Sequence, residues 1–180
     1  MIVALDLRDS GKDKGNHQRA AFNLQAYRMN LFQRAFARLP FTKPRPLHLQ
    51  STRAERGAYG ESLAAYYCRR TLGYRVITRN WRGRRGELDL ICRDGAVLVF
   101  IEVRTRAEDA LVSGYYSIDA NKKAVLHRTC RQYLKQLQSP PKSFRFDIID
   151  VALSAAGVGK VSHYPNIPLF HKHYTARNSE

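Results

Sequence analysis

The sequence contains little cysteine, a single tryptophan, few acidic residues and no long apolar run. Cys68, Cys92 and Cys130 are widely spaced and form no C-x-x-C pair, so the sequence indicates neither a disulfide framework nor a zinc site. No stretch approaches the length of a transmembrane helix, and the first residues lack the apolar segment of a signal peptide. We therefore expect a cytoplasmic protein with no stable membrane insertion.

The shortage of acidic residues leaves a strongly basic chain. Its 180 residues include 31 Lys and Arg against 15 Asp and Glu, which gives a net charge of +16. Such an excess predicts a polyanionic partner, either nucleic acid or an anionic membrane surface. Hydrophobic residues make up 44% of the chain, which is enough for one domain of ordinary size with an appendage.

The appendage is expected at the N-terminus, where residues 1–53 form a basic extension. Apolar residues recur at helical spacing between about 16 and 39, and a proline-containing linker follows at 40–46. This amphipathic helix could contact phosphates or lipid head groups, or could dock on the main domain. In a third reading, Met29 is the true start of the protein.

Residues 86–104 are the most informative part of the sequence. They form two β-runs joined by the turn dipeptide at 94–95, which predicts a β-hairpin. A two-residue turn there places Glu87 opposite Glu102, with Asp89 on the same face. Because like charges on facing positions are destabilising, this cluster needs a cation, and a divalent metal is one candidate. The alternative is a solvated edge neutralised by the many arginines.

Two helices are expected to point a charged side chain toward the sheet. The first runs from 51 to about 72, with Glu61 on its apolar stripe, and the second spans roughly 120–136, with Lys122 at the head of its stripe. The stripe of the first helix is Ala58, Ala65, Cys68 and Leu72. Glu61 either joins the acidic cluster or lies at the wet end of the stripe. Lys122 either points inward, toward the sheet, or extends outward into solvent from the first turn of its helix.

An arginine-rich stretch connects a short strand at 74–78 to the hairpin, and we expect it to be a loop. Arginines that alternate with an aromatic residue suit a surface that grips phosphates while the ring stacks on a base. The residues concerned are Arg79, Trp81, Arg82, Arg84 and Arg85. Alternatively, the loop is simply solvated and Trp81 folds into the core. Further strands are expected at 144–153 and 161–164.

Taken together, these motifs resemble a known family. The motifs are Gly60-Glu61-x-x-Ala64, Gly73-Tyr74, Arg79-Asn80-Trp81-Arg82, Gly86-Glu87-Leu88-Asp89-Leu90-Ile91, Phe100-Ile101-Glu102-Val103-Arg104-Thr105-Arg106, Lys122 and Arg145-Phe146-Asp147. They look like the bacterial YraN family, which is similar to PD-(D/E)XK nucleases of the Holliday junction resolvase type. The resemblance covers residues 54–170 and leaves 171–180 as a flexible tail. It implies a restriction-endonuclease-like α/β core, with a mixed central sheet flanked by helices.

The resemblance also implies an activity. Asp89, Glu102 and Glu61 would hold Mg²⁺ or Mn²⁺ for the hydrolysis of phosphodiester bonds in branched or single-stranded DNA. By analogy, the protein would form a homodimer. Arg104 occupies the position where these nucleases usually have lysine, and since arginine stays protonated it can orient a phosphate but cannot deprotonate water. Lys122 would then supply the missing amine.

Arg106 joins the arginine-rich stretch as an expected nucleic-acid contact. Two other functions stay open at this point. One is a non-catalytic nucleic-acid-binding module that keeps the nuclease shape. The other is a basic peripheral membrane protein anchored by the helix at 16–39.

Overall fold

The computed structural model describes residues 42–48, 50–84, 86–110 and 118–170. The expected N-terminal helix, Met29, Arg85 and the tail at 171–180 lie outside these residues. The elements, in chain order, are α2 (Arg53–Arg70), β1 (Arg75–Arg82), β2 (Glu87–Asp94), β3 (Val97–Ala107), α3 (Ala120–Lys135), β4 (Ser143–Leu153) and β5 (Gly159–Tyr164). None of the helices within the described ranges is long and apolar enough to cross a membrane.

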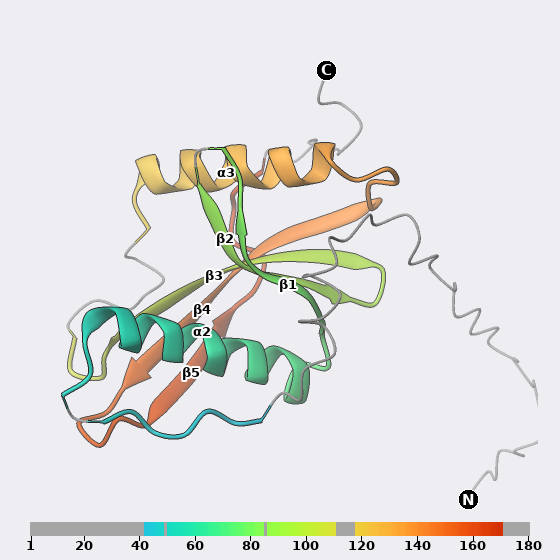
Figure 1. Cartoon of the computed structure of the whole chain (residues 1–180). Coiled ribbons are helices and arrows are strands. Elements are labelled where there is room, and N and C mark those ends of the chain that lie inside the picture. Colours follow the sequence, from blue (N-terminus) through green and yellow to red (C-terminus); the bar gives the residue numbers. More distant parts are fainter. Residues whose placement is uncertain (1–41, 49, 85, 111–117, 171–180) are drawn as a thin grey trace, which may run out of the picture.

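The strands form one mixed sheet in the order β1-β2-β3-β4-β5. β3 and β4 are parallel and the other neighbours are antiparallel. Parallel neighbours need a crossover connection, and α3 lies within the crossover between β3 and β4. Figure 1 shows α2 and α3 on opposite sides of the sheet. The predicted α/β fold, with a mixed sheet flanked by helices, is confirmed.

Because a helix covers each face, the sheet separates two apolar cores. The α2 side buries Leu90, Cys92, Val99, Ile101, Ile149 and Val151 against the helix. The α3 side buries Leu88, Ile91, Leu98, Phe100, Phe146 and Ile148. The sequence predicted a single apolar face on the hairpin, with Leu88 on it. That prediction was wrong, because the second face is also covered and Leu88 packs on the α3 side.

Helix α2 begins with a capping box. The Thr52 hydroxyl accepts a hydrogen bond from the backbone N–H of Glu55, and the Glu55 carboxylate accepts one from the N–H of Thr52. The helix ends at Arg70, and Gly73 follows with a φ of +70°, a conformation that glycine adopts without strain. Ala58 is exposed, so the predicted buried stripe was wrong at that position, and the stripe begins at Tyr59 instead.

The β2–β3 turn differs from its prediction. Asp94 pairs with Val97, so Gly95 and Ala96 are the central turn residues. Gly95 has a φ of +53°, which suits the first central position of a type II′ turn. The Arg93 side chain donates a hydrogen bond from Nε to the Gly95 carbonyl at 2.8 Å. The pairing is therefore displaced by two residues, and an even displacement does not exchange the two faces of the hairpin.

This displacement corrects the predicted contact between acids. Glu87 does not face Glu102 but pairs with Arg82 on β1. The Arg82 Nε and Glu87 Oε2 atoms are 3.7 Å apart and both side chains are largely exposed, so this ion pair adds little stability. The crowding of acids at this place in the sheet involves Asp89 and Glu102 instead.

Strand β1 also runs further than predicted. Arg79, Trp81 and Arg82 were expected in a loop, yet they pair with Leu90, Leu88 and Glu87 of β2. The register shifts between Val76 and Thr78, and Asn80 takes a φ of +50°, which asparagine tolerates better than most residues. These irregularities let the Trp81 ring pack edge-on against Tyr133 of α3, at 5.2 Å between ring centroids. That long-range contact leaves no signal in the local sequence.

The Arg145-Phe146-Asp147 motif builds a closed polar network on the α2 side. The Asp147 side chain is completely buried and lies 3.0 Å from Arg145 Nε and 2.9 Å from His163 Nε2. It also accepts a hydrogen bond from the backbone N–H of Asn166. Arg145 also forms an ion pair with Asp94 and donates a hydrogen bond to the Tyr74 hydroxyl. Asp147 thereby ties β4, β5 and the hairpin turn together.

We expect Asp147→Asn to lower the free energy of unfolding by about 2–4 kcal/mol, because it removes a buried charge and leaves Arg145 and His163 without their carboxylate. Asp94→Asn is a matched control: it touches the same Arg145, but 45% of the Asp94 side chain is exposed, so its cost should stay below about 1 kcal/mol. Denaturant unfolding at neutral pH measures both values. Equal losses in the free energy of unfolding for the two variants would show that Asp147 does not hold these strands together more strongly than Asp94 does.

Candidate active site

The candidate site lies where β2 and β3 separate. Their pairing ends at Leu90 and Ile101. Beyond that pair, the backbone N–H of Val103 donates a hydrogen bond to the Asp89 Oδ2 atom at 2.7 Å. A carboxylate thus satisfies a strand N–H at the point where the ladder ends. This contact holds Asp89 against the residue that follows Glu102.

Glu102 is the most deeply buried acid of the site, with 3% of its side chain exposed. Its Oε1 atom lies 3.0 Å from Lys122 Nζ and 3.7 Å from Arg104 Nη1. Its Oε2 atom is buried and has no hydrogen-bond partner among the described residues. A buried carboxylate is costly unless its oxygens are paired, so Glu102 keeps one open position for a cation or a donor.

Burial and the negative charges of neighbouring acids raise the pKa of both Asp89 and Glu102. Burial, then the negative charges of Glu102 and Glu61, raise the pKa of Asp89 from 3.8 to about 7, while the Val103 N–H and Lys122 act against this rise. Burial likewise raises the pKa of Glu102, against the opposing effects of Lys122 and Arg104. Two carboxylates in a poorly solvated place compete for one proton or one cation.

The two other acids lie at the edges of this pair. Glu61 is half-buried on α2, and its charge helps to raise the pKa of Asp89. The helix comes so close to β3 here that a Cβ atom on Gly60 would collide with the Thr105 side chain. Glu87 is exposed, and its charge adds to the raised pKa of Glu102. The charges of Glu61 on α2 and Glu87 on β2 therefore act on the pair formed by Asp89 and Glu102.

The residues of the arginine-rich stretch lie in different surroundings. Arg79 is half-buried and donates a hydrogen bond to the Ser62 hydroxyl of α2 at 3.0 Å. Ser62 directly follows Glu61 in the sequence. Trp81 is half-buried against α3, whereas Arg82 and Arg84 are exposed. Arg85 lies outside the described residues. The base-stacking role predicted for Trp81 stays a prediction.

Arg106 extends the polar side of β3 beyond Arg104. Its Nε atom lies 3.0 Å from Asp150 Oδ2, and its Nη1 atom donates to the carbonyls of Ala107 and Glu108. The Asp150 side chain is 2% exposed, and its Oδ1 atom has no hydrogen-bond partner among the described residues. The register places Asp150 beside Arg104, so this buried carboxylate lies between two arginines of β3.

A family model described as "Uncharacterised protein family UPF0102" matches residues 60–151, about half of the chain. The chain belongs to UPF0102. The match includes Glu61, Asp89, Glu102, Arg104 and Lys122, so the whole candidate site lies inside the family region. UPF0102 is the YraN-like group of PD-(D/E)XK nuclease-like proteins, which confirms the resemblance stated from the motifs.

Several bacterial relatives are similar to this UPF0102 chain. A UPF0102 protein of Mycolicibacterium vanbaalenii is 39% identical over 116 residues, 64% of this chain and 95% of the relative. UPF0102 protein STH1475 of Symbiobacterium thermophilum is 43% identical over 95 residues, 53% of this chain and 80% of the relative. A UPF0102 protein of Dichelobacter nodosus is 41% identical over 98 residues, 54% of this chain and 77% of the relative. These names give the family and no activity.

The acids of the UPF0102 chain form a close pair with outlying members rather than a compact triad. Within the described ranges, no three His, Cys, Asp or Glu side chains lie close enough together to hold one metal ion. Mg²⁺, however, is usually bound by one or two carboxylates, with water and substrate phosphates completing its shell. The open Oε2 atom of Glu102, next to Asp89, fits that smaller set.

Sequence reasoning missed three residues that shape the surroundings of the site. Asp150 had a signal, because it is a charged residue inside the apolar strand β4. Ser62, which receives Arg79, and Gln132, which accepts a hydrogen bond from the backbone N–H of Arg84 at 3.0 Å, had none. Their partners are distant in sequence, and polar residues on exposed helix faces are ordinary.

The raised pKa of Asp89 predicts a pH-dependent stability in metal-free buffer. The folded protein binds this proton more tightly than the unfolded chain, so stability should fall as pH rises from about 4 to about 7. Asp89→Asn keeps an oxygen for the Val103 N–H and removes the charge. We compare the free energy of unfolding of the variant with that of the wild type at each pH. Between pH 4 and pH 8 this difference should shift by about 2–4 kcal/mol in favour of the variant, because one pKa unit corresponds to about 1.4 kcal/mol.

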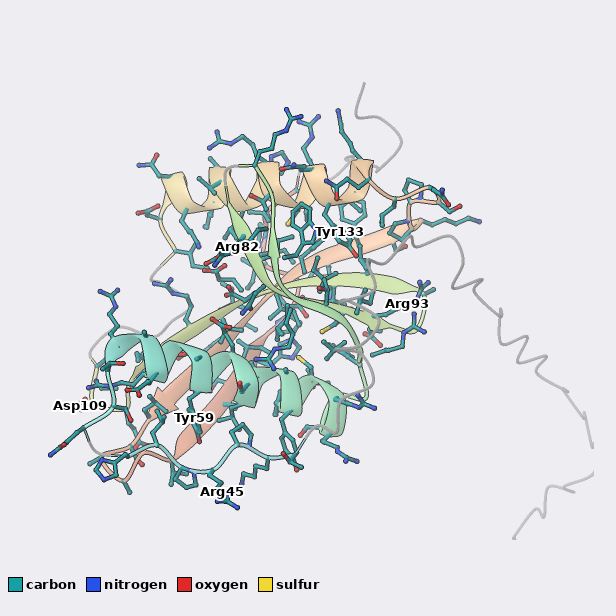
Figure 2. All side chains as sticks on the ribbon, in the orientation of Figure 1. Arg45, Tyr59, Arg82, Arg93, Asp109 and Tyr133 are labelled. Atoms are coloured by element: carbon teal, nitrogen blue, oxygen red, sulfur yellow. The ribbon has the colours of Figure 1, made fainter. Side chains whose placement is uncertain are left out.

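Urea unfolding in EDTA at a series of pH values measures this difference. The exposed residue Asp109, labelled in Figure 2, provides the control Asp109→Asn, which should follow the wild-type curve. Parallel curves for Asp89→Asn and the wild type would show that Asp89 ionises normally in the folded protein.

Proposed function

We propose that this UPF0102 chain is a divalent-metal-dependent endonuclease that hydrolyses phosphodiester bonds of DNA, with branched or single-stranded DNA as its substrate. The observation that carries the proposal is the Glu102 side chain, which is buried beside Asp89 with one oxygen unpartnered among the described residues. Asp147, on the other side of the sheet, has both of its oxygens paired, and Glu102 differs from Asp150, which also has an unpartnered oxygen, in lying beside a second acid whose pKa is raised. The basic composition supports a polyanionic substrate.

Asp89 and Glu102 are the residues proposed to hold the metal, with Glu61 as the third acid. Mg²⁺ or Mn²⁺ bound there would polarise the phosphoryl group and lower the pKa of the attacking water. Binding of a cation would also relieve the repulsion that raises the pKa of both carboxyl groups. The metal-holding role thus accounts for a destabilising arrangement that the fold maintains.

Two cations of the chain have separate roles in this proposal. Arg104 stands where related nucleases usually carry lysine, lies next to Glu102, and can orient a phosphate through two parallel hydrogen bonds. Lys122 reaches the same carboxylate from the first turn of α3, with 38% of its side chain exposed. We assign to Lys122 the amine that the Arg104 position lacks. This assignment takes the sequence-based idea further, since the contact with Glu102 provides the required proximity.

A second candidate function is a non-catalytic nucleic-acid-binding protein with the same fold. The observation that favours it is the pairing of Lys122 with Glu102, which already neutralises part of the acid cluster without any metal. In that case the cluster would only fix α3 to the sheet. Metal would then change neither the stability nor the chemistry of the protein.

We expect the wild-type protein to cleave DNA in Mg²⁺ or Mn²⁺ and to be inactive in EDTA. Asp89→Asn and Glu102→Gln should each lower the cleavage rate by at least about 100-fold, because each removes a charge that holds the metal. Mg²⁺ should raise the melting temperature of the wild type by mass action and should leave Glu102→Gln unchanged. The assay compares labelled branched, single-stranded and duplex DNA, with Asp109→Asn as the control.

The two readouts separate the two candidate functions. Binding of DNA without cleavage, together with a melting temperature that Mg²⁺ does not alter, would reject the endonuclease and favour the binding module. Cleavage that persists in Glu102→Gln would locate the activity elsewhere or in a contaminant.

Lys122 can be tested apart from the acids. Lys122→Gln leaves Glu102 without its closest cation, so we expect a loss of about 1–3 kcal/mol in the free energy of unfolding at pH 8, with a smaller loss at pH 5, where Glu102 takes up a proton more readily. Lys122→Arg keeps the charge and should keep the stability within about 1 kcal/mol. It should nevertheless cut the cleavage rate by at least about 10-fold.

The exposed neighbour Lys123 supplies the control Lys123→Gln, which should change neither quantity by much. A fully active Lys122→Arg variant would show that Lys122 only neutralises Glu102.

A further inference from the structure

Helix α3 carries a concentrated positive charge that its own sequence does nothing to offset. Its 16 residues include Lys122, Lys123, Arg128, Arg131 and Lys135, and none is Asp or Glu. A polyanion lying along the helix would offset this positive charge.

The loop between β1 and β2 is held directly against this helix. The backbone N–H of Arg84 donates a hydrogen bond to Gln132 Oε1 at 3.0 Å. A Cβ atom on Gly83 would lie 2.6 Å from the same oxygen, and one on Gly86 would lie 2.6 Å from Thr129 Oγ1. A side chain at position 86 would therefore collide with α3, and one at position 83 would displace the Gln132 side chain. The contact fixes the backbone of Arg84 against α3.

The end of β1, the loop and the helix together contribute five basic residues, which we call the α3 surface and define as Arg82, Arg84, Arg128, Arg131 and Lys135. Arg82, Arg84, Arg128 and Lys135 are exposed, and Arg131 is half-buried. Figure 2 shows side chains with nitrogen tips projecting from α3 away from the sheet. Glu87 offsets little of this charge, since its ion pair with Arg82 is long and largely exposed.

The helical residues of the α3 surface lie about half a turn around α3 from Lys122, on the side of the helix away from the acid pair. Lys122, in the first turn of α3, contacts Glu102, and Lys135 ends the helix. The 13 steps between them span about 20 Å at 1.5 Å per residue. That length corresponds to about six steps of a duplex at 3.4 Å each. A nucleic-acid backbone that follows the basic residues would therefore run along the outer side of α3, with the helix between it and the acid pair.

The side chains of the α3 surface indicate the kind of polyanion. Membrane-binding helices insert large apolar side chains into the lipid. Among the described residues the only exposed large apolar side chain is Val158, in the turn between β4 and β5. Surfaces for single strands stack bases on exposed aromatic rings, and the α3 surface has none of these. What it offers is a row of cations suited to a phosphate backbone.

We propose that the α3 surface binds the phosphate backbone of a DNA duplex arm, independently of sequence. The inference rests on the proposed nucleic-acid partner and does not depend on cleavage. Gln132 is a positioning residue in it, since it holds the arginine loop without contacting DNA itself.

The test measures duplex binding in EDTA, where cleavage plays no part. The double variant Arg128→Gln/Lys135→Gln is compared with Arg53→Gln/Arg70→Gln, which removes the same charge from exposed positions on α2, across the sheet. The affinity should fall with salt, and the slope of log K against log salt should shrink by about 0.9 for each phosphate that the protein no longer neutralises, thus by about 1.8 in the α3 variant. The α2 variant should keep the wild-type slope.

The substitution Gln132→Ala tests the position of the loop without changing the net charge of the protein. We expect weaker duplex binding with little change in slope, because the arginine loop is no longer fixed. Equal slopes in the two double variants would overturn the proposal. So would tight binding to anionic lipid vesicles that the α3 variant loses while its duplex binding is intact. A protein that binds through the α3 surface but never cleaves would refute the endonuclease and leave this inference standing.

Discussion

The arrangement of the site depends on two carboxyl groups held together away from water. Asp89 is fixed by the Val103 N–H where β2 leaves β3, and Glu102 is buried against Lys122. Burial and repulsion raise the pKa of both, and the fold has to compensate for that cost. Lys122 of α3 offsets part of it. Lys122 does not neutralise all of the carboxylate charge, and the charge that is left suits the site to binding a further cation.

The sheet separates two buried acids with opposite characters. Asp147, on the α2 side, has every carboxylate oxygen engaged by Arg145, His163 or Asn166, and it stabilises the junction of three strands. Glu102, on the α3 side, keeps an oxygen without a partner among the described residues. Both acids belong to motifs that carry the family resemblance. The two acids differ in their hydrogen-bond partners and in the second acid, Asp89, that lies beside Glu102.

The hairpin shows how far local patterns reach. Alternating residues predicted that Asp89 and Glu102 come together, and they do so although the turn is displaced by two residues, because an even displacement does not exchange the faces. Glu87 was expected opposite Glu102 and instead pairs with Arg82. The choice between two possible turns depends on small differences in backbone conformation at Gly95. The amino-acid composition of the turn does not predict which of the two turns forms.

The sequence by itself determined the order of the elements, the α/β class and the approximate bounds of both helices, because hydrophobic periods are local properties of the chain. The tertiary structure alone decided that α3 covers the polar face of the hairpin, that Trp81 lies in a strand against Tyr133, and that Gln132 holds the arginine loop. These contacts join residues about 50 positions apart. Each depends on how the layers pack, which local spacing does not encode.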